Sequence, residues 1–600
     1  SALDDYVEIR DVNVSLRGLS NDERDILNFA YVNSQNEKQF LEVLDKLLET
    51  RVYHETITYE EKNQEKLSKI IDFENIRNRI ISLQEDKKNI DVSICQNKFK
   101  GEYLEYYNKS KESKNYLYQI TKQQGLMPIR SMMELYSEFL LKLFPCWLLS
   151  PESVSMIFPL NKDMFDLILF DEASQVFIEN TLPTIYRGKN IVVAGDSKQL
   201  RPTATFMKRY MGNDSDEELD LATIAALEVE SLLDLATSRY NSTNLTYHYR
   251  SKNEELINFS NYAFYDGKLQ IAPNITKNSK SKPIERIKVD GKWINRKNQE
   301  EANAIVALLK KLLKGKKNKS SIGIITFNTE QEMAIEDAID EECQNDPAFR
   351  DAYLKERNRK ENGEDISLFI KNLENVQGDE RDIIIFSIGY AQNEYGKVVA
   401  HFGPLSVEGG ENRLNVAITR AKEKIYVVTS IEPEELLVEG TKNLGPKIFK
   451  NYLKYVRAVS DKKENEVQYI LDAYKPTMKT SEDEVKLNQF ENDIKAELVK
   501  LGYEVETNLG NSNYKISLAI YDKTIDKYLL GIECDHTAYN SSSSILERDV
   551  YRNKFLASRG WKILRVWSRD WWLNKNKVIS KIVKIANANK RQFEKSSEEN

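Results

Sequence analysis

The chain has few cysteines, and none is placed to build a metal site. Its 600 residues contain four, Cys95, Cys146, Cys343 and Cys534, with no Cys-x-x-Cys pair and no Cys/His ligand spacing. Structural zinc sites depend on such pairs, so the pattern argues against one. Scattered cysteines in a large polar chain indicate a reducing environment, and we expect a cytoplasmic protein.

Long apolar runs and an excess of positive charge are also missing. No apolar run of the sequence approaches the roughly 18–20 residues that a membrane-spanning helix needs. Lys and Arg total 87 against 94 Asp and Glu, which gives a formal net charge of −7. A nucleic-acid-binding protein with this balance must gather its positive charge locally, in a channel or groove.

Glycine is scarce in residues 1–140, where charged residues stand between apolar residues at helical spacing. This pattern predicts long helices, and an antiparallel stalk is one arrangement that would satisfy it. Two interpretations stay open: a purely structural helical domain, or a stalk that guides nucleic acid.

From 165 to 430 short apolar runs alternate with helical segments, among them "FDLILF", "NIVVAG", "SIGIITF", "RDIIIFSIG" and "KIYVVTS". Continuous apolar strands alternating with helices are typical of parallel sheets in α/β domains. Residues 437–485 are expected to form a helical linker, and 486–575 a compact α/β/α unit. The Lys-, Asn- and Glu-rich tail at 576–600 is expected to fray.

Two carboxylates end the first of these strands. Asp171 and Glu172 directly follow "FDLILF", at the carboxyl end of a predicted parallel strand, where open α/β sheets bind their ligands. ATPases use paired carboxylates of this kind to hold Mg²⁺ and to orient the attacking water. The pair alone is a modest signal, because acidic residues often end strands.

Four later segments strengthen the ATPase interpretation. In "VVAGDSKQLRPT", Asp196 and Gln199 follow a strand and could sense a γ-phosphate and its water. In "LTYHYRSKNEEL" and "LNVAITRAKEK", Arg250 and Arg420 are candidate cations for the charge of a transferring phosphoryl group. Three further candidates in "NVQGDERDIIIFS" come just before a strand: Gln377, Gly378 and Glu380.

These five segments, in their order along the chain, resemble motifs II to VI of superfamily 1 helicases. The likeness is strongest to the branch that contains the RNA helicases of nonsense-mediated decay and their large bacterial relatives, and it covers about residues 125–435. It implies two RecA-like domains, an incomplete first one at 141–245 and a second at 246–436, with 1–140 as a helical insert. It also implies a motor that uses ATP and Mg²⁺ to move on single-stranded DNA, with RNA as an alternative.

The resemblance also implies a role for each site residue. Asp171 would hold Mg²⁺ and Glu172 would be the catalytic base. Gln199 would couple the γ-phosphate to nucleic acid, and Arg250 and Arg420 would contact that phosphate. The residues expected to bind the nucleotide and link it to nucleic acid are Asp196, Gln377, Gly378 and Glu380.

The phosphate-binding loop of such an ATPase is missing from the sequence. No Gly-x-x-x-x-Gly-Lys-Ser/Thr motif occurs, and no Gly-Lys pair is followed by Ser or Thr. We expect the loop to lie upstream in a longer protein or on a second polypeptide; a degenerate ATPase is the third alternative. Without the loop's backbone N–H groups and lysine, nucleotide binding should be weak and hydrolysis nearly absent.

The C-terminal unit resembles a second family, the Vsr-related PD-(D/E)xK endonucleases. Glu533 and Asp535 alternate along a predicted strand and match that family's "IECD", which implies that they hold a Mg²⁺ or Mn²⁺ ion. Ser517 stands where the family has Asp, and His536 where it usually has Gly, so a principal metal ligand is lost. Two interpretations stay open: cleavage with Asp549 or His536 as substitute ligand, or a module that only grips nucleic acid.

The sequence therefore predicts an ATP-dependent superfamily 1 helicase fused to an endonuclease-like domain, with DNA processing or antiviral defence as its setting by resemblance. The rival prediction is a non-enzymatic nucleic-acid-binding or regulatory subunit that completes an ATPase site in another chain. The location of the phosphate loop, in the same reading frame or in a partner, discriminates between them.

Overall fold

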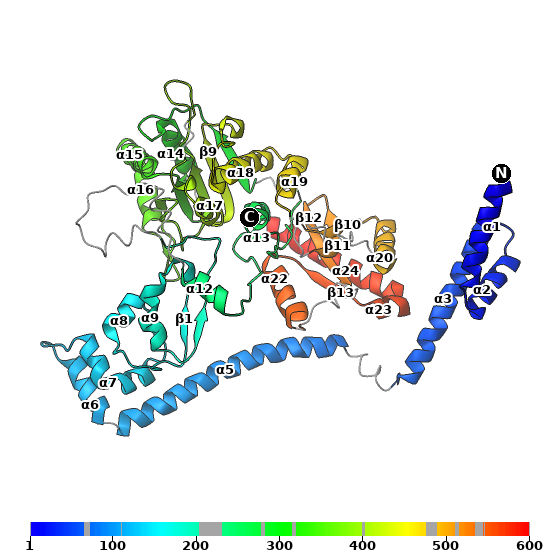
Figure 1. Cartoon of the computed structure of the whole chain (residues 1–600), viewed down its shortest axis with the longest axis horizontal. Helices are drawn as coiled ribbons and strands as arrows, with labels where there is room; N and C mark the ends of the chain where they lie inside the picture. The colour runs from blue at the N-terminus through cyan, green and yellow to red at the C-terminus, as the bar shows by residue number, and fades with distance from the viewer. Residues whose placement is uncertain are drawn as a thin grey trace. The chain divides into compact units, whose positions relative to one another are not determined.

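A computed structural model describes residues 2–64, 73–109, 111–202, 231–277, 282–314, 320–398, 402–475, 489–510, 515–534, 544 and 546–598. The chain divides into two compact units, Ser1–Glu102 and Tyr103–Asn600 (Figure 1). Within the described ranges, no helix combines the length and the apolar character that a membrane span requires.

The N-terminal part of the chain is helical, as predicted. Ser20 begins one helix with a reciprocal cap, in which its hydroxyl accepts the Glu23 N–H and the Glu23 carboxylate accepts the Ser20 N–H. The Asn36 side chain caps the next helix in the same position. The helices are α1 (Ala2–Arg17), α2 (Asn21–Val32), α3 (Glu37–Lys62), α5 (Phe73–Lys109), α6 (Lys111–Thr121), α7 (Ile129–Leu143) and α8 (Pro151–Ile157).

The "FDLILF" and "NIVVAG" segments form a pair of short parallel strands. β1 (Ile168–Phe170) pairs with β2 (Ile191–Val193), and Leu169 lies opposite Val192. One face of the pair packs on three short helical segments, η1 (Ala173–Gln175), α9 (Ile178–Tyr186) and α12 (Leu232–Arg239). This face positions the residues that follow each strand.

The larger unit also contains a five-stranded sheet in which every neighbouring pair is parallel. Its inner strand β4 is buried along its whole length, because helices cover both faces of a parallel sheet. The strands in spatial order are β3 (Ile284–Lys288), β9 (Ala421–Thr429), β8 (Arg381–Ser387), β4 (Ile322–Thr326) and β7 (Phe369–Asn372).

Two groups of helices cover this sheet, one on each face (Figure 1). One group is α14 (Gln299–Leu313), α15 (Thr329–Asn345) and α16 (Pro347–Arg357); the other is α13 (Glu255–Tyr265), α17 (Gly410–Ile418), α18 (Leu444–Ser460) and α19 (Glu464–Asp472). Phe449, Tyr452 and Tyr455 of α18 are buried in the core. The segment expected as a linker at 437–485 therefore contributes a covering helix to the sheet.

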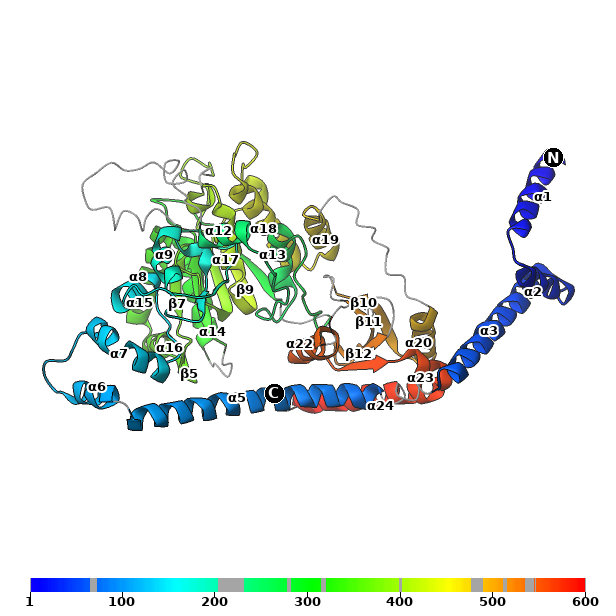
Figure 2. The ribbon, with the colours of Figure 1, turned by 60° about the horizontal axis from the view of Figure 1, so that its bottom comes forward.

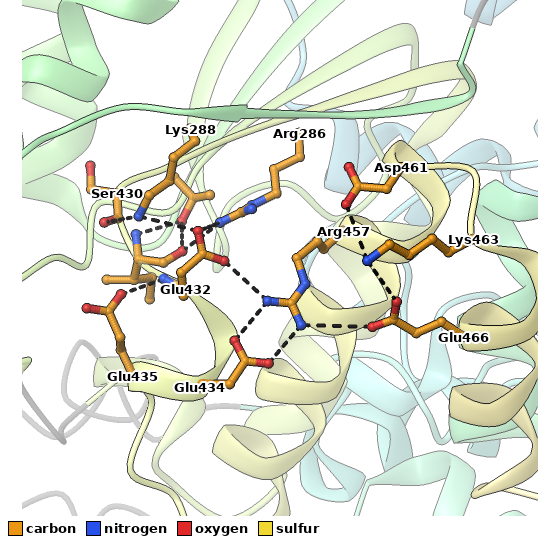
Figure 3. A network of polar contacts seen from close by, with 12 residues as sticks. Arg286, Lys288, Ser430, Glu432, Glu434, Glu435, Arg457, Asp461, Lys463 and Glu466 are labelled. Carbon is orange, nitrogen blue, oxygen red and sulfur yellow. Dashed lines mark hydrogen bonds and ion pairs between the residues drawn. The ribbon is translucent and has the colours of Figure 1, made fainter.

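An ion-pair network joins α18 and α19 to the edge strand β3 and to the turn η3 (Pro433–Glu435) (Figure 3). Arg457 contacts Glu434 through two nitrogens, at 2.8 and 2.7 Å, and approaches Glu432 at 3.3 Å and Glu466 at 3.9 Å. Arg286 of β3 donates to the same Glu432 at 2.7 Å. Such two-pronged arginine contacts hold the helices in one register against the sheet.

The C-terminal unit is built on a four-stranded mixed sheet (Figure 2). β10 (Glu504–Leu509), β11 (Ile516–Asp522) and β12 (Lys527–Cys534) are antiparallel, and β13 (Ile563–Val566) joins β12 in parallel. One face packs on α20 (Gln489–Lys500), α23 (Ser568–Leu573) and α24 (Lys575–Glu598), and the other on α22 (Arg552–Ser558), which follows the π-helical turn η4 (Glu547–Tyr551). These sheets confirm the predicted α/β class, with parallel sheets followed by an α/β/α unit.

The expectation of a frayed tail at 576–600 is wrong. Residues Lys575–Glu598 form α24, and its Ile582 and Ala586 are fully buried against the sheet. Apolar residues recur there at helical spacing between the lysines and asparagines, which suffices to make one face of the helix pack.

Candidate functional site

β1 delivers its two carboxylates to a tight turn at the carboxyl end of the strand. Phe170 is buried, Asp171 is exposed, and Glu172 is half-buried in a left-handed conformation with φ 51° and ψ 39°. The end of β2 lies close to this turn because Gly195 has no side chain; a Cβ there would come within 3.1 Å of the Ala173 backbone nitrogen. This packing fixes the direction in which both carboxylates leave the sheet.

Glu172 is joined by hydrogen bonds to two of the other predicted segments. The Gln377 Nε2 donates to Glu172 Oε2 at 3.1 Å and lies 3.4 Å from Gln199 Oε1. Gln199 in turn donates to Asp196 at 3.0 Å. Gly378, with φ 86°, makes the turn that follows Gln377, a conformation that glycine adopts without strain. The structure thus brings four predicted residues into one chain of contacts.

Asp196 is held in place by residues that the sequence did not single out. The Tyr265 hydroxyl donates to Asp196 Oδ2 at 2.7 Å. The Asn415 amide lies 2.9 Å from that hydroxyl and donates to the Lys198 carbonyl at 2.8 Å. Burial and the adjacent Asp196 charge raise the pKa of Tyr265, so it remains a hydrogen-bond donor at neutral pH. These contacts tie the loop after β2 to α13 and α17.

Arg250 and Glu380 form a direct ion pair, although 130 residues separate them in the sequence. The Arg250 Nε donates to Glu380 at 2.6 Å, and Lys422 approaches the other carboxylate oxygen at 2.8 Å. Burial opposes ionisation of Glu380, but these two cations outweigh it and lower the pKa of the carboxyl group. A further nitrogen of Arg250 lies 3.4 Å from the Thr419 carbonyl, next to Arg420.

Arg420 is a buried cation that donates hydrogen bonds to neutral groups. Only 3% of its surface is exposed. Its guanidinium donates to the Val416 carbonyl at 2.7 Å, the Thr419 hydroxyl at 3.0 Å and the Asp379 carbonyl at 3.4 Å. Burial and the nearby charge of Arg250 lower the pKa of Arg420 to about 10, still well above neutral. A buried guanidinium that lacks an ion-paired carboxylate in the described residues is well suited to an anionic ligand.

These residues fit a magnesium–nucleotide complex on its terminal-phosphate side. Asp171 is exposed and suits a hard cation. Arg420 offers buried positive charge, and the buried Oε1 of Gln377 has no hydrogen-bond partner in the part of the chain that the structure describes. That oxygen could accept a hydrogen bond from a water held by Glu172. The arrangement can therefore bind phosphate and orient a water, but the described residues contribute no loop that would cradle the rest of the triphosphate.

In the second predicted site, around Glu533 in the C-terminal unit, the carboxylates are paired with arginines. Glu533, on β12, contacts Arg552 at 2.6 Å through one oxygen and Arg565 at 2.9 Å through the other. Asp549 contacts Arg565 through one oxygen and Arg548 at 3.0 Å through the other. Each of the four carboxylate oxygens thus meets a guanidinium. Both carboxylates are buried, and only 6% of Glu533 and 3% of Asp549 is exposed.

The described residues at this site do not fit a divalent metal ion. Opposite Glu533, where the antiparallel register of Leu518 and Ile532 extends by one residue, stands Ser517 in place of a carboxylate. No cluster of three or more potential metal ligands occurs in the described ranges. Asp535 and His536 lie outside the described residues, so their predicted roles stay predictions.

Sequence reasoning missed several residues that organise the two sites. Arg565 lies within the short strand β13, directly opposite Glu533 in the parallel register. A lone arginine inside an apolar strand was the available signal, since such a residue needs a buried acid. Tyr265 and Asn415 gave no comparable signal, because their partners lie 69 and 217 residues away.

Two families of known proteins match this chain, one over the region of the five-stranded sheet and one over the C-terminal unit. Residues 229–432 match a family described as an AAA domain, and residues 490–585 match the family REase_MTES_1575. The second match extends into α24, in agreement with the packing of that helix.

Curated relatives cover most of the chain. It is 34% identical over 500 residues to an uncharacterized ATP-dependent helicase of Mycoplasma genitalium, an alignment that spans 83% of this chain and 43% of the relative. An uncharacterized ATP-dependent helicase of Methanocaldococcus jannaschii is 27% identical over 50% of this chain and 40% of the relative. The DNA replication ATP-dependent helicase/nuclease of Gallus gallus is 28% identical over 44% of this chain and 23% of the relative.

The chain is therefore homologous to ATP-dependent helicases and combines a helicase-type AAA region with a restriction-endonuclease-like region. It spans about two fifths of the length of the first relatives.

Proposed function

We propose that this chain carries the phosphate-sensing part of a superfamily 1 helicase motor, which uses ATP to move along single-stranded nucleic acid. The observation that carries the proposal is the contact of Gln377 with both Glu172 and Gln199. This contact joins Glu172, which follows β1, and Gln199, which follows β2, to Gln377 of the five-stranded-sheet region. Such a joint is what a motor needs, because hydrolysis must change how two sheet regions meet.

The residues divide the chemistry as follows. Bound Mg²⁺–ATP supplies the phosphoryl group and the cation that neutralises its charge. Asp171 holds the cation, and Glu172 accepts a proton from the attacking water, which Gln377 helps to orient. Arg250 and Arg420 stabilise charge on the transferring group. Asp196, Gln199, Gly378 and Glu380 keep these groups in register, and Glu380 does so by holding Arg250.

The phosphate-binding loop comes from outside these 600 residues, on an upstream segment or a second polypeptide. Support lies in the uncovered face of the β1–β2 pair. Leu169 and Val192 lie opposite each other on that face and are 61 and 46% exposed, and Leu167, directly before β1, is 52% exposed. Parallel strands are normally buried on both faces, so this face suits further strands or helices. A loop carried by such a partner would arrive beside Asp171.

We assign the substrate as single-stranded DNA, with RNA as an alternative, and the setting as DNA processing or antiviral defence. The name of the avian relative supports DNA, because it is called a DNA replication helicase/nuclease. We propose 141–245 as the first RecA-like domain and 246–436, extended by the covering helix α18, as the second, with 1–140 as the helical insert. The nuclease-like domain, expected at 486–575, is extended to include α24, which packs in its core.

For the nuclease-like region we favour a module that grips nucleic acid without cutting it. The pairing of every oxygen of Glu533 and Asp549 with arginine supports this choice. A carboxylate engaged in this way is a poor ligand for a divalent cation. Cleavage in Mg²⁺ or Mn²⁺ that is lost on Glu533→Ala substitution would refute it.

The test of the motor supplies the missing loop. ATP hydrolysis is measured for this chain alone, for the loop-bearing polypeptide alone, and for both together with single-stranded DNA. We expect hydrolysis only from the combination, and its loss when the loop lysine is replaced by alanine. Equal hydrolysis by the chain alone would contradict the proposal, as would a combination that stays inactive.

A further inference from the structure

The segment that carries Arg250 continues into a strap that lies on the nuclease-like sheet. Residues 272–277 run beside β12, where the Tyr528 N–H donates to the Ile275 carbonyl at 2.9 Å. The Trp561 indole donates to the Pro273 carbonyl at 2.7 Å, and the rings of Trp561 and Tyr528 belong to the same hydrophobic cluster as the buried Ala272. Lys277 also pairs with Glu506 of β10. These contacts bury the start of the strap, Ala272 and Pro273, against the nuclease-like region, and Ile275 packs half-buried on the same hydrophobic cluster.

A second contact between the two regions lies directly at the turn that presents Arg250. Arg559, which follows α22, donates a hydrogen bond to the Tyr249 carbonyl. Tyr247 donates to Glu547 of η4, and its ring packs against Phe555 with 5.1 Å between the centroids. The residue immediately before Arg250 is therefore held from the nuclease-like region.

The residue immediately after Arg250 is held within the turn itself. The Ser251 N–H donates to the His248 Nε2 at 3.0 Å, and the Ser251 hydroxyl donates to the Ala421 carbonyl at 3.2 Å. Desolvation and the nearby charges of Arg250 and Arg559 lower the pKa of His248 to about 3. The ring is then neutral at physiological pH and can accept this hydrogen bond. Arg250 thus leaves a turn that is fixed on both sides.

We propose that Arg559 is a positioning residue for Arg250, through which the nuclease-like region controls ATP hydrolysis. The inference rests on the proposed function. Its physical basis is the position of the turn. Arg559 donates a hydrogen bond to the Tyr249 carbonyl, and this turn sets where the Arg250 guanidinium lies. Misplacement of a catalytic group by roughly 1 Å can lower a rate by about 100-fold. α22 begins at Arg552, the partner of Glu533, and Arg559 directly follows its last residue, so the two ends of this helix contact the two candidate sites.

The kinetic test uses the complete assembly with its phosphate loop. Arg559→Ala should lower kcat for ATP by about 10-fold or more with little change in KM, because Arg250 acts mainly on the transition state. Arg559→Lys should restore most of the rate, since an ammonium can also donate to the carbonyl. Lys562→Ala, an exposed residue three positions on, is the matched control and should leave the rate unchanged.

A double-mutant cycle separates positioning from a general structural effect. In an Arg250→Ala background, Arg559→Ala should lower the rate no further, because its effect passes through the missing side chain. Equal loss in both backgrounds, or a wild-type rate for the single variant, would overturn the proposal.

Hydrogen exchange gives a readout that does not depend on ATP hydrolysis. Exchange at the Ser251 amide should become faster in Arg559→Ala than in Lys562→Ala, as the turn loosens. Unchanged exchange would overturn the inference. An inactive wild-type assembly in which Ser251 exchange still responds to Arg559→Ala would instead overturn the proposed motor function and leave the contact itself confirmed.

Discussion

The site around Glu172 and the site around Glu533 combine carboxylates with arginines in opposite ways. Glu172 contacts neutral amides, and the buried Arg420 donates its described hydrogen bonds to carbonyls and a hydroxyl. Glu533 instead has an arginine on each oxygen, and Arg565 bridges it to Asp549. In the first site the positive charge of Arg420 is available to a ligand. In the second site the charges of the arginines and of the carboxylates neutralise each other inside the protein. Residue type alone therefore does not show which cation is available to a ligand: Arg420 has no ion-paired carboxylate in the described residues, whereas Arg565 has two.

Among the substitutions of arginines, the largest effect should come from Arg420, the cation available to a ligand. Arg420→Ala in the complete assembly should lower kcat by about 10³-fold, because an arginine that stabilises the transferring phosphoryl group contributes roughly that much. Steady-state ATP hydrolysis with single-stranded DNA measures it. Arg239→Ala, an exposed arginine at the end of α12, is the control. A rate within a few-fold of wild type would remove Arg420 from the site and weaken the comparison.

The next largest effect should come from removing Arg565, which pairs with both Glu533 and Asp549. Arg565→Met should lower the free energy of unfolding of the nuclease-like region by about 3–5 kcal/mol, because it leaves Glu533 and Asp549 with unbalanced buried charge. Urea unfolding followed by the fluorescence of Trp561 and Trp571 measures the change, since both indoles are buried there. Lys562→Met serves as control. Unchanged stability would mean that the cluster is not structural.

A smaller effect concerns the uncovered face near the open site. Leu169→Asp should weaken binding of the loop-bearing polypeptide by about 10- to 100-fold, because a charge would be buried at the interface. Titration calorimetry gives the Kd. Leu437→Asp, 70% exposed and outside the β1–β2 pair, should bind normally. Equal weakening by both variants would count against this face as the docking surface.

The smallest effect is on acid stability. Burial alone would raise the pKa of Glu533, but Arg552 and Arg565 outweigh it and hold the pKa below its ordinary value. Such a carboxylate stabilises the fold above the unfolded-state pKa of about 4.3, and this contribution is lost as pH falls through the lower folded value. Glu533→Gln should therefore flatten the loss of stability below about pH 4.3. Urea midpoints between neutral and acid pH test it; an unchanged acid slope would contradict the pairing.

Local sequence patterns predicted much of the fold and the position of several residues of the candidate site. Asp171 and Glu172 were placed correctly at the end of a strand, because apolar runs and strand ends are local features. Local patterns could not predict the hydrogen bond from Gln377 to Glu172, because 205 residues separate the two partners. The pairing of Glu533 was also missed, although its partners Arg552 and Arg565 lie only 19 and 32 residues away and the position of Arg565 inside an apolar strand was a signal. A motif shows which carboxylate is present, but only the fold shows whether that carboxylate is already paired with an arginine.

The most direct measurement of the central claim is ATP hydrolysis by the complete assembly carrying Glu172→Gln, beside wild type and Glu179→Gln. Glu179 is an exposed residue in the first turn of α9, so its substitution controls for the loss of one negative charge. We predict that Glu172→Gln abolishes hydrolysis while ATP still binds, and that Glu179→Gln hydrolyses ATP normally. Hydrolysis at the wild-type rate by Glu172→Gln would contradict the account of this site.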